Sequence, residues 1–218
     1  MQHLAEKFLT AEEYQQINTA VERAEQSTAG EIVCMVHTAS YHYPMSNVIG
    51  AAALALPAAL ALTPLLGGWL WIGTQNMWVF LSILAPVFIL GHWVVKHIPW
   101  LKRIFISDRE MDEEVEEAAV TSFFKHGLYR TKEGTGILIF ISVFERKVWV
   151  LADAGIDAKV GSDHWQSVVA GITEGIRNHR AAAAICLAVD TIGRTLAEHF
   201  PVAPDDINEL ENVIKPDS

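Results

Sequence analysis

The feature that most limits the fold of this chain is a central block without charge. From Ile32 to Val95 the sequence contains not one Asp, Glu, Lys or Arg. Two long apolar runs lie inside this block, at residues 47–66 and 77–95. The apolar core of a bilayer is about 30 Å thick, which roughly 20 helical residues can span. The block therefore predicts a transmembrane helical hairpin over residues 47–95, with the lipid bilayer as its partner.

Two other structures fit the same runs. One is a helical hairpin buried in a soluble core, although buried helices rarely lack charge over two such lengths. The other is a re-entrant hairpin that enters the bilayer without crossing it. Pro57, Pro64 and Pro86 do not argue against helices here, because membrane helices tolerate proline better than soluble ones do.

The basic residues predict an orientation. Lys96, Lys102 and Arg103 follow the second run, whereas the link between the runs has no Lys or Arg. Basic residues favour the cytoplasmic side, and two crossings return a chain to the side on which it began. The segment from Met1 to Gln26 has no continuous apolar core, so we do not expect a secretory signal peptide there. The sequence thus predicts a multi-pass protein of the cell (inner) membrane with both termini in the cytoplasm.

Charge and cysteine content exclude several classes of protein. The net charge of −10 argues against a nucleic-acid partner, because such surfaces are normally basic. Cys34 and Cys186 are too few for a disulfide framework, and both lie among apolar neighbours. We expect Cys34 to pack in the core rather than to act as a nucleophile.

Local signals outside the block predict helices and three strands. Thr10 with Glu13 and Ser107 with Glu110 have the spacing of helix-capping boxes. Gly127 is the expected end of the second of these helices. The apolar, β-branched segments predict strands at residues 31–37, 137–144 and 148–152. Two further helices are expected before Pro201, the first of them capped by Ser162.

These elements predict an α/β (α+β) fold, in which helices cover a small mixed β-sheet and a transmembrane hairpin interrupts the domain. Residues 1–46 would form its first part and residues 96–200 the remainder. Residues 201–218 would form a mobile tail. Because both ends of the hairpin return to one side, the strand before it can still join the strands after it.

Two segments carry a resemblance to a known family. They are "GEIVCMV" at residues 30–36 and "GTGILIFISVFERKVWVLADAGIDAKVGSDHW" at residues 134–165. Together they resemble the TPM domain family, especially its bacterial membrane-protein branch with two spans inside the domain. The resemblance extends over residues 9–200. It implies a small sheet sandwiched by helices, and the family includes photosystem repair proteins, proteins proposed to be acid phosphatases, and calcium binders.

Asp153 and Asp157 are the candidate metal ligands, with Asp163 further along the chain. A turn at the end of a strand can aim carboxylates at a hard cation such as Ca²⁺ or Mg²⁺. Turn formation and helix capping explain the same residues. Cation-binding members of the TPM family commonly have Asp-Asn-Gly before the apolar strand, where this chain has Gly-Thr-Gly at residues 134–136, which weakens the metal hypothesis.

Two functions follow as hypotheses. The first is a membrane-anchored TPM-like module that faces the cytoplasm and helps to assemble or maintain membrane proteins, with a membrane protein as partner. The alternative is a cation-dependent phosphatase or other phosphoester hydrolase that uses Asp153 and Asp157. The sequence has no P-loop, GxSxG or HExxH motif, so it names no reaction. Small residues such as Gly50 and Ala51 would also permit a homo-oligomer through the spans.

Overall fold

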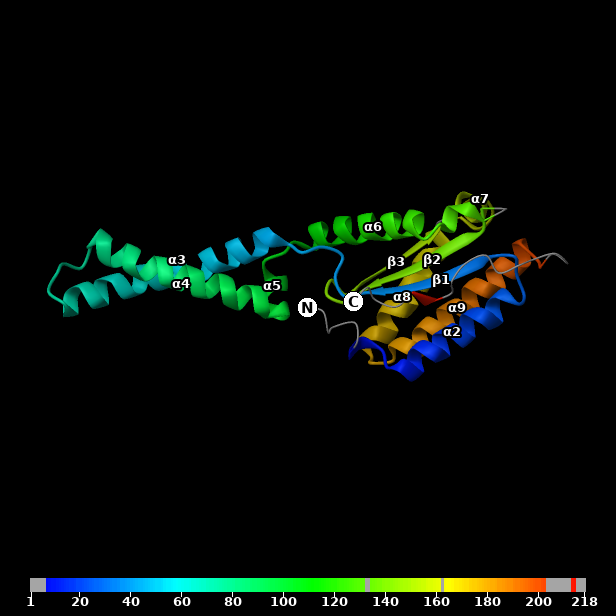
Figure 1. Ribbon diagram of the computed structural model, residues 1–218, viewed down its shortest axis with the longest axis horizontal. Helices are drawn as coiled ribbons and strands as arrows, with labels where there is room; N and C mark the ends of the chain where they lie inside the picture. Colours follow the sequence, from blue (N-terminus) through cyan, green and yellow to red (C-terminus); the bar gives the residue numbers. More distant parts are fainter. Residues whose placement is uncertain (1–6, 132–133, 162, 203–212, 215–218) are drawn as a thin grey trace. The chain divides into compact units, whose positions relative to one another are not determined.

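A computed structural model describes residues 7–131, 134–161, 163–202 and 213–214 (Figure 1). They fall into two compact units, one of residues 42–111 and the other of the described residues before 42 and after 111. In chain order the elements are α2 (Ala11–Glu25), β1 (Glu31–His37), α3 (Pro44–Trp69), α4 (Met77–His97), α5 (Pro99–Ile104), α6 (Asp108–Lys125), η1 (Leu128–Arg130), β2 (Gly136–Ser142), β3 (Lys147–Ala152), α7 (Ala154–Val160), α8 (Asp163–Arg177), α9 (Ala181–His199) and β4 (Val213–Ile214).

The second unit, which we call the domain, is built on a mixed sheet with the strand order β3-β2-β1-β4. Strands β1 and β2 run parallel, with Ile32 opposite Ile137. Strands β2 and β3 form an antiparallel hairpin in which Ile139 lies opposite Val150. The predicted α+β fold with a small mixed sheet is confirmed, including the pairing of a strand before the hairpin with strands after it.

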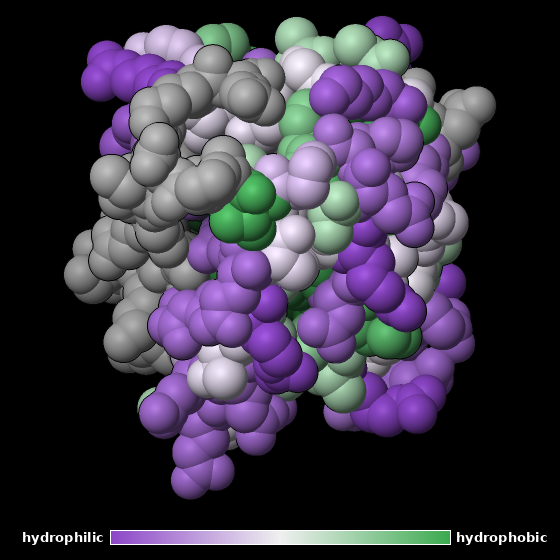
Figure 2. All heavy atoms as spheres, turned by 90° about the vertical axis from the view of Figure 1, so that its right-hand side faces the viewer, coloured by the Kyte–Doolittle hydropathy of each residue, from purple (hydrophilic) through white to green (hydrophobic). Residues whose placement is uncertain are grey.

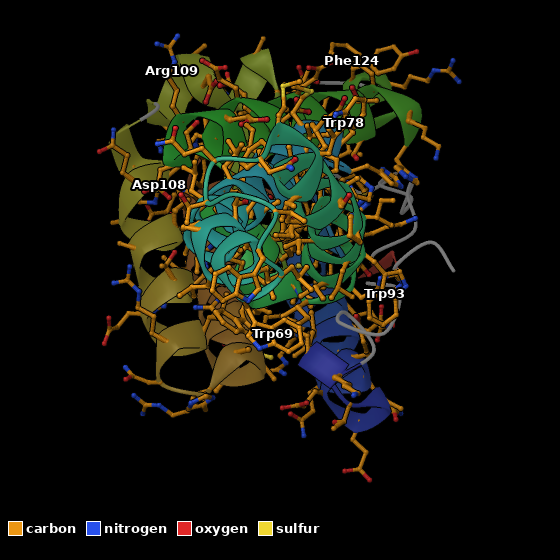
Figure 3. The ribbon with its side chains drawn as sticks, turned by 90° about the vertical axis from the view of Figure 1, so that its left-hand side faces the viewer. Trp69, Trp78, Trp93, Asp108, Arg109 and Phe124 are labelled. Atoms are coloured by element: carbon orange, nitrogen blue, oxygen red, sulfur yellow. The ribbon has the colours of Figure 1, made fainter. Side chains whose placement is uncertain are left out.

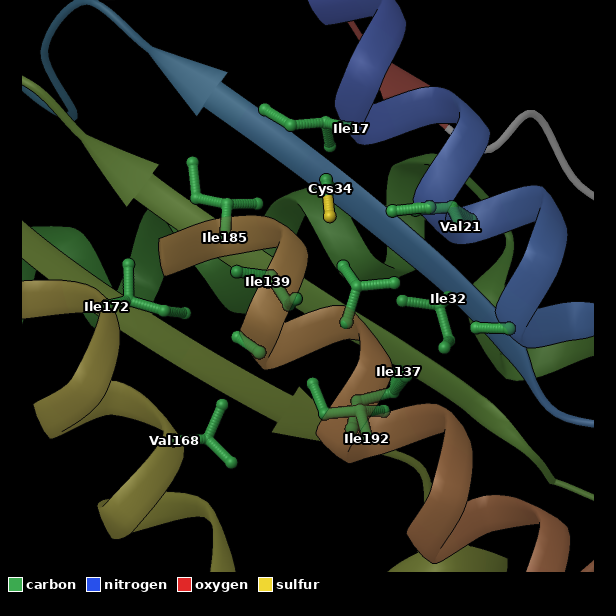
Figure 4. Close-up of a cluster of buried hydrophobic side chains, with 14 of the residues drawn as sticks. Ile17, Val21, Ile32, Cys34, Ile137, Ile139, Val168, Ile172, Ile185 and Ile192 are labelled. Atoms are coloured by element: carbon green, nitrogen blue, oxygen red, sulfur yellow. The ribbon is translucent and has the colours of Figure 1, made fainter. Parts of the chain in front are cut away.

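Side chains alternate between the two faces of this sheet, as strand geometry requires. Ile32, Cys34 and Ile139 point to the face that α2, α8 and α9 cover, and they pack there with Ile185 and Ile192 of α9 (Figure 4). The opposite face carries Val33, Met35, Leu138 and Phe140, which pack against Val115, Ala119 and Phe123 of α6. Because both faces are covered, every residue of β2 is buried, which explains its unbroken apolar sequence.

The helix caps match the predictions where they can be seen. Thr10 Oγ1 accepts a hydrogen bond from Glu13 N, and Glu13 Oε2 accepts one from Thr10 N. Ser107 Oγ accepts from Glu110 N at 3.1 Å. Gly127 has a φ of 76° just after the end of α6. The predicted cap Ser162 lies outside the described residues.

Three elements differ from the predictions. Strand β2 ends at Ser142 rather than Phe144, because the chain turns there toward β3. The segment after β3, expected as a turn, forms the short helix α7. Val213 and Ile214 pair with Cys34 and Met35 as a fourth strand, within a segment that we expected to be a mobile tail. Most of that tail, residues 203–212 and 215–218, lies outside the described residues.

Candidate functional site

Helices α3 and α4 lie side by side (Figure 1). Each helix is long and apolar enough to cross a membrane, with a mean hydropathy of 2.0 over its most apolar window. Leu60, Leu65 and Ile89 are all exposed, Ile89 to 69%. A hairpin in a soluble core would bury such side chains, so the structure does not match that alternative.

Small and polar side chains form the contact between these two helices. Gly91 of α4 lies so close to Ala51 that a Cβ atom on it would sit 3.3 Å from the Ala51 Cα. Besides Ser46 and Gly50, buried positions of α3 recur every four residues, at Asn47, Ala51, Ala55, Ala59, Thr63 and Gly67. Small residues at this spacing let helix backbones approach closely. Ala51, Ala55 and Ala59 thus pack inside the hairpin, whereas Ala53 and Ala61 are exposed and free to contact a second copy.

Exposed tryptophans mark both ends of the hairpin. Trp69, Trp71 and Trp78 lie at or beside the link between the helices, and Trp93 and Trp100 lie near the other end. Figure 3 shows the side chains of Trp69, Trp78 and Trp93 at the outside of the helix pair. Tryptophan is enriched at the two surfaces of a bilayer, where its ring is apolar and its N–H meets water. The two groups have the arrangement expected of a hairpin that crosses.

A buried lysine connects the two chain segments that flank the α3–α4 hairpin. Lys102 of α5 is 2% exposed, and its Nζ donates a hydrogen bond to the carbonyl oxygen of His42. This bond joins the chain before α3 to the chain after α4. Burial lowers the pKa of Lys102, and the nearby charge of Lys96 lowers it further.

Residues in and beside the β2–β3 turn contact the chain just before and just after the inserted α3–α4 hairpin. Glu145 in this turn is fully buried. Its Oε1 accepts from Ser40 N at 2.9 Å, and its Oε2 accepts from the Ser142 hydroxyl. Just beyond the turn, Lys147 Nζ lies 2.7 Å from Asp112 Oδ1. The chain therefore leaves the domain after Ser40 and re-enters it at Asp112 beside the same turn.

The predicted metal ligands serve structural roles in the structure. Asp153 caps α7, since its Oδ1 accepts from Ala154 N at 2.7 Å. Asp157 Oδ1 accepts from Trp165 Nε1 at 3.3 Å. The side chain of Asp163 lies outside the described part of the chain. Nowhere among the described residues do three His, Cys, Asp or Glu side chains come together to hold a metal ion. The cation site at Asp153 and Asp157 stays a prediction.

The structure also contains a cavity lined by acidic side chains, the acidic opening, which the sequence did not predict. Glu22 and Glu25 of α2 and Glu31 of β1 line a cavity of about 400 Å³. Glu25 Oε1 also accepts from Ile32 N at 3.0 Å, so this carboxylate helps to fix the start of β1. Glu22 and Glu25 are three apart and share a helix face, which the sequence shows. The approach of Glu31 to that face depends on how α2 packs on β1.

Other titratable side chains of the chain are accounted for by packing or by exposure to solvent. The His37 ring packs against Phe140 with ring centres 4.8 Å apart, and the His97 ring packs against Trp93 at 4.7 Å. Cys34 is buried in the core, as expected. Burial raises the pKa of the Cys34 thiol, so it stays protonated and unreactive near neutral pH. The exposed acidic residues of α6, such as Glu116 and Glu117, lie on its solvated face.

Comparison with known families identifies the domain. The family model described as TPM domain matches residues 103–195, from the end of α5 into α9. The chain contains a TPM domain. The match begins after the hairpin, and the structure adds β1 to it, because β1 pairs in parallel with β2 along its whole length. The hairpin is thus inserted into the TPM domain rather than attached to one end of it.

A solved structure has a similar fold. It is the NMR structure of the BA42 protein from the psychrophilic bacterium Bizionia argentinensis, which is 21% identical to this chain. The alignment covers 96% of each chain with a TM-score of 0.59. At this identity the likeness shows the fold alone. No curated protein sequence matches the chain.

Proposed function

We propose that this protein is an integral membrane protein whose TPM domain faces the cytoplasm and acts there as an interaction or maintenance module for other membrane proteins. The observation that carries the anchor is the place of the hairpin in the fold. It lies between β1 and β2, which are neighbours in one sheet. A single crossing would put these two strands on opposite sides of the bilayer, so the chain must cross twice or not at all.

The exposed surface of the hairpin supports two crossings. Its apolar side chains face outward along α3 and α4, and tryptophans stand at both ends. The basic residues Lys96, Lys102 and Arg103 follow the hairpin, whereas the link at residues 70–76 has none. By the positive-inside rule, the link lies outside the cytoplasm and the TPM domain inside it.

The interaction role is supported by the TPM domain together with the lack of a recognisable reaction motif in the sequence. A fold alone does not transfer an activity, so the partner has to be found by experiment. Affinity capture from mild detergent tests this role with the intact protein. A phosphatase assay with Mg²⁺, Ca²⁺ and EDTA provides the opposing test, and cation-dependent turnover lost in Asp153→Asn would replace the interaction role with catalysis.

Thiol labelling in intact cells tests the topology. In a background without Cys34 and Cys186, one cysteine replaces Thr74 in the link, and in a second variant one replaces Gln166 of α8. Both positions are exposed in the structure. A membrane-impermeant reagent should label position 74 in intact cells and position 166 only after the cells are opened.

The alternatives give different patterns. Labelling of 166 alone would reverse the orientation. Protection of both positions in intact cells, with both labelled after opening, would indicate a hairpin that does not cross. Release of the protein by sodium carbonate would show that it is not an integral membrane protein.

A further inference from the structure

One stripe of residues at the base of the hairpin has an unusual composition. Trp93, Lys96 and His97 of α4 and Trp100 and Ile104 of α5 are all exposed, Trp93 to 59% and Trp100 to 66%. Trp93, Lys96 and His97 share one face of α4 by their spacing of three or four residues, and Trp100 and Ile104 share a face of α5, which follows the extended residue Ile98. The stripe therefore presents one indole ring on the helical face of the Lys96 ammonium and a second indole ring in the next helix.

Within this stripe the His97 ring contacts the Trp93 carbonyl oxygen at 2.7 Å, whereas Lys96 and the two indole N–H groups are unused by the described residues. In the described part of the chain, the Lys96 ammonium and the indole N–H groups of Trp93 and Trp100 have no hydrogen-bond or ion-pair partner. By contrast, Lys102 donates to the His42 carbonyl. Lys96 is thus left to interact with a group outside the chain.

The stripe lies at the depth of lipid headgroups. An α-helix rises about 1.5 Å per residue, and the apolar core of a bilayer is about 30 Å thick. At this rise, the helical stretch from Trp78, beside the link, to Trp93 is somewhat shorter than the bilayer core. The stretch from Trp78 to His97, where α4 ends, is close to the thickness of the core. A span that begins near Trp78 therefore ends between Trp93 and Trp100.

The positive charge of the chain around the stripe favours an anionic lipid headgroup. The segment of residues 96–111 holds four basic and two acidic residues, a net charge of +2, so the rest of the chain carries −12. An anionic membrane surface repels that acidic remainder and attracts the base of the hairpin. Lysine is a compact cationic partner for phosphate, and indole N–H groups can donate to lipid carbonyl oxygens.

We propose that the stripe formed by Trp93, Lys96, His97, Trp100 and Ile104 binds the headgroup of an anionic phospholipid. Lys96 contacts the phosphate, while Trp93 and Trp100 lie beside the glycerol region of the lipid. This inference rests on the proposed membrane anchor. It adds a preference for one class of lipid, which an apolar hairpin by itself does not provide.

The test uses the full-length protein in a mild non-ionic detergent, with native mass spectrometry of bound phosphatidylglycerol and phosphatidylcholine. The wild type should bind phosphatidylglycerol more tightly. Lys96→Gln should weaken phosphatidylglycerol binding about fivefold, the effect of one lysine near an anionic surface, and weaken phosphatidylcholine binding less, because the choline ammonium offsets the charge of its phosphate. Lys96→Arg should keep the preference. Trp100→Ala should weaken the binding of both lipids.

Arg177→Gln is the matched control, because it removes one positive charge from an exposed helical position in the domain. Equal binding of the two lipids, or an equal loss in Arg177→Gln and Lys96→Gln, would overturn the inference. So would competition by millimolar inorganic phosphate, which would show an anion site rather than a lipid site. A carbonate-resistant protein with no headgroup preference overturns this inference alone, whereas release by carbonate overturns the anchor.

Discussion

The hairpin and the TPM domain place apolar side chains in opposite ways. In the domain, Ile185 and Ile192 of α9 are fully buried against the sheet. Most described residues on the domain face shown in Figure 2 are hydrophilic. In the hairpin, large apolar residues such as Leu60 are exposed, while Asn47 and Thr63 are buried.

The difference supports the proposal that the two regions fold in different solvents. In water the burial of apolar surface drives folding, so large apolar side chains collect inside. In lipid the surroundings are as apolar as leucine, and helices associate through close packing of small residues and a few polar contacts. The hairpin has the second pattern and the domain the first. Substitutions with the same chemistry should therefore have different effects in the two regions.

The largest difference is expected for substitutions that replace exposed leucine or isoleucine by a charged residue. Arginine at Leu60 and Ile89, near the middle of the two spans, should cost about 2.5–3.5 kcal/mol each on insertion. We expect most of the double variant to be released by sodium carbonate. Leu187→Arg is the control, because Leu187 is 63% exposed on α9 of the domain. If Leu60→Arg with Ile89→Arg stays in the membrane like Leu187→Arg, the hairpin does not face lipid.

The next largest difference is expected when a large apolar side chain in each region is shortened to alanine. Ile139→Ala in the centre of the sheet should lower the unfolding free energy of the domain by about 2–5 kcal/mol. Leu65→Ala on the exposed face of α3 should change it by less than about 0.5 kcal/mol. Amide hydrogen exchange of β1 and β2 in the solubilised full-length protein measures both. Equal protection in the two variants would contradict a core centred on β2.

Overpacking of the helix contact should have a smaller effect. Ala59 is fully buried, so Ala59→Leu should destabilise the hairpin by about 1–3 kcal/mol. Ala61→Leu makes the same change at an exposed position and should be nearly neutral. The readout is protease cleavage of the link at residues 70–76 in detergent. Faster cleavage of the Ala61 variant would show that the opposite face of α3 forms the contact.

The smallest effect is expected at the cap of α7. Asp153→Ala removes the acceptor for Ala154 N and should cost about 1 kcal/mol, measured as a lower Tm in EDTA. Asp153→Asn should cost less, since asparagine also caps helices. The same pair of variants tests the predicted cation site. A rise in Tm with Ca²⁺ that Asp153→Asn abolishes would confirm that site.

Much of the fold could be predicted from the sequence because its signals are local. The charge-free block predicts two spans, and α3 and α4 contain them. Strand β1 and the capping box at Thr10 were found in the same way. Helix α7 was missed, because a short segment with Gly155 inside and Gly161 after it resembles a turn. Strand β4 was missed because so short a strand gives no periodicity.

The candidate sites were harder to predict, since they depend on residues far apart in the chain. Glu145 lies between two predicted strands with no motif of its own, yet Ser40, which precedes the whole α3–α4 hairpin, donates to its carboxylate. The acidic opening forms only because Glu31 packs next to α2. The hydrogen bond at the base of the α3–α4 hairpin forms only because Lys102 lies next to His42. No local pattern contains such contacts.

The sequence alone determined which segments are apolar and which of them form long helices or the strands β1 to β3, and it predicts that the two ends of the hairpin return to one side. These properties follow from composition and periodicity within short windows. Only the tertiary structure decided that the neutral stripe from Asn47 to Gly67 lies inside the hairpin, and that the β2–β3 turn holds the chain on both sides of the insertion. Burial and hydrogen bonding between distant residues are set by packing, because a side chain's neighbours are known only once the elements have docked.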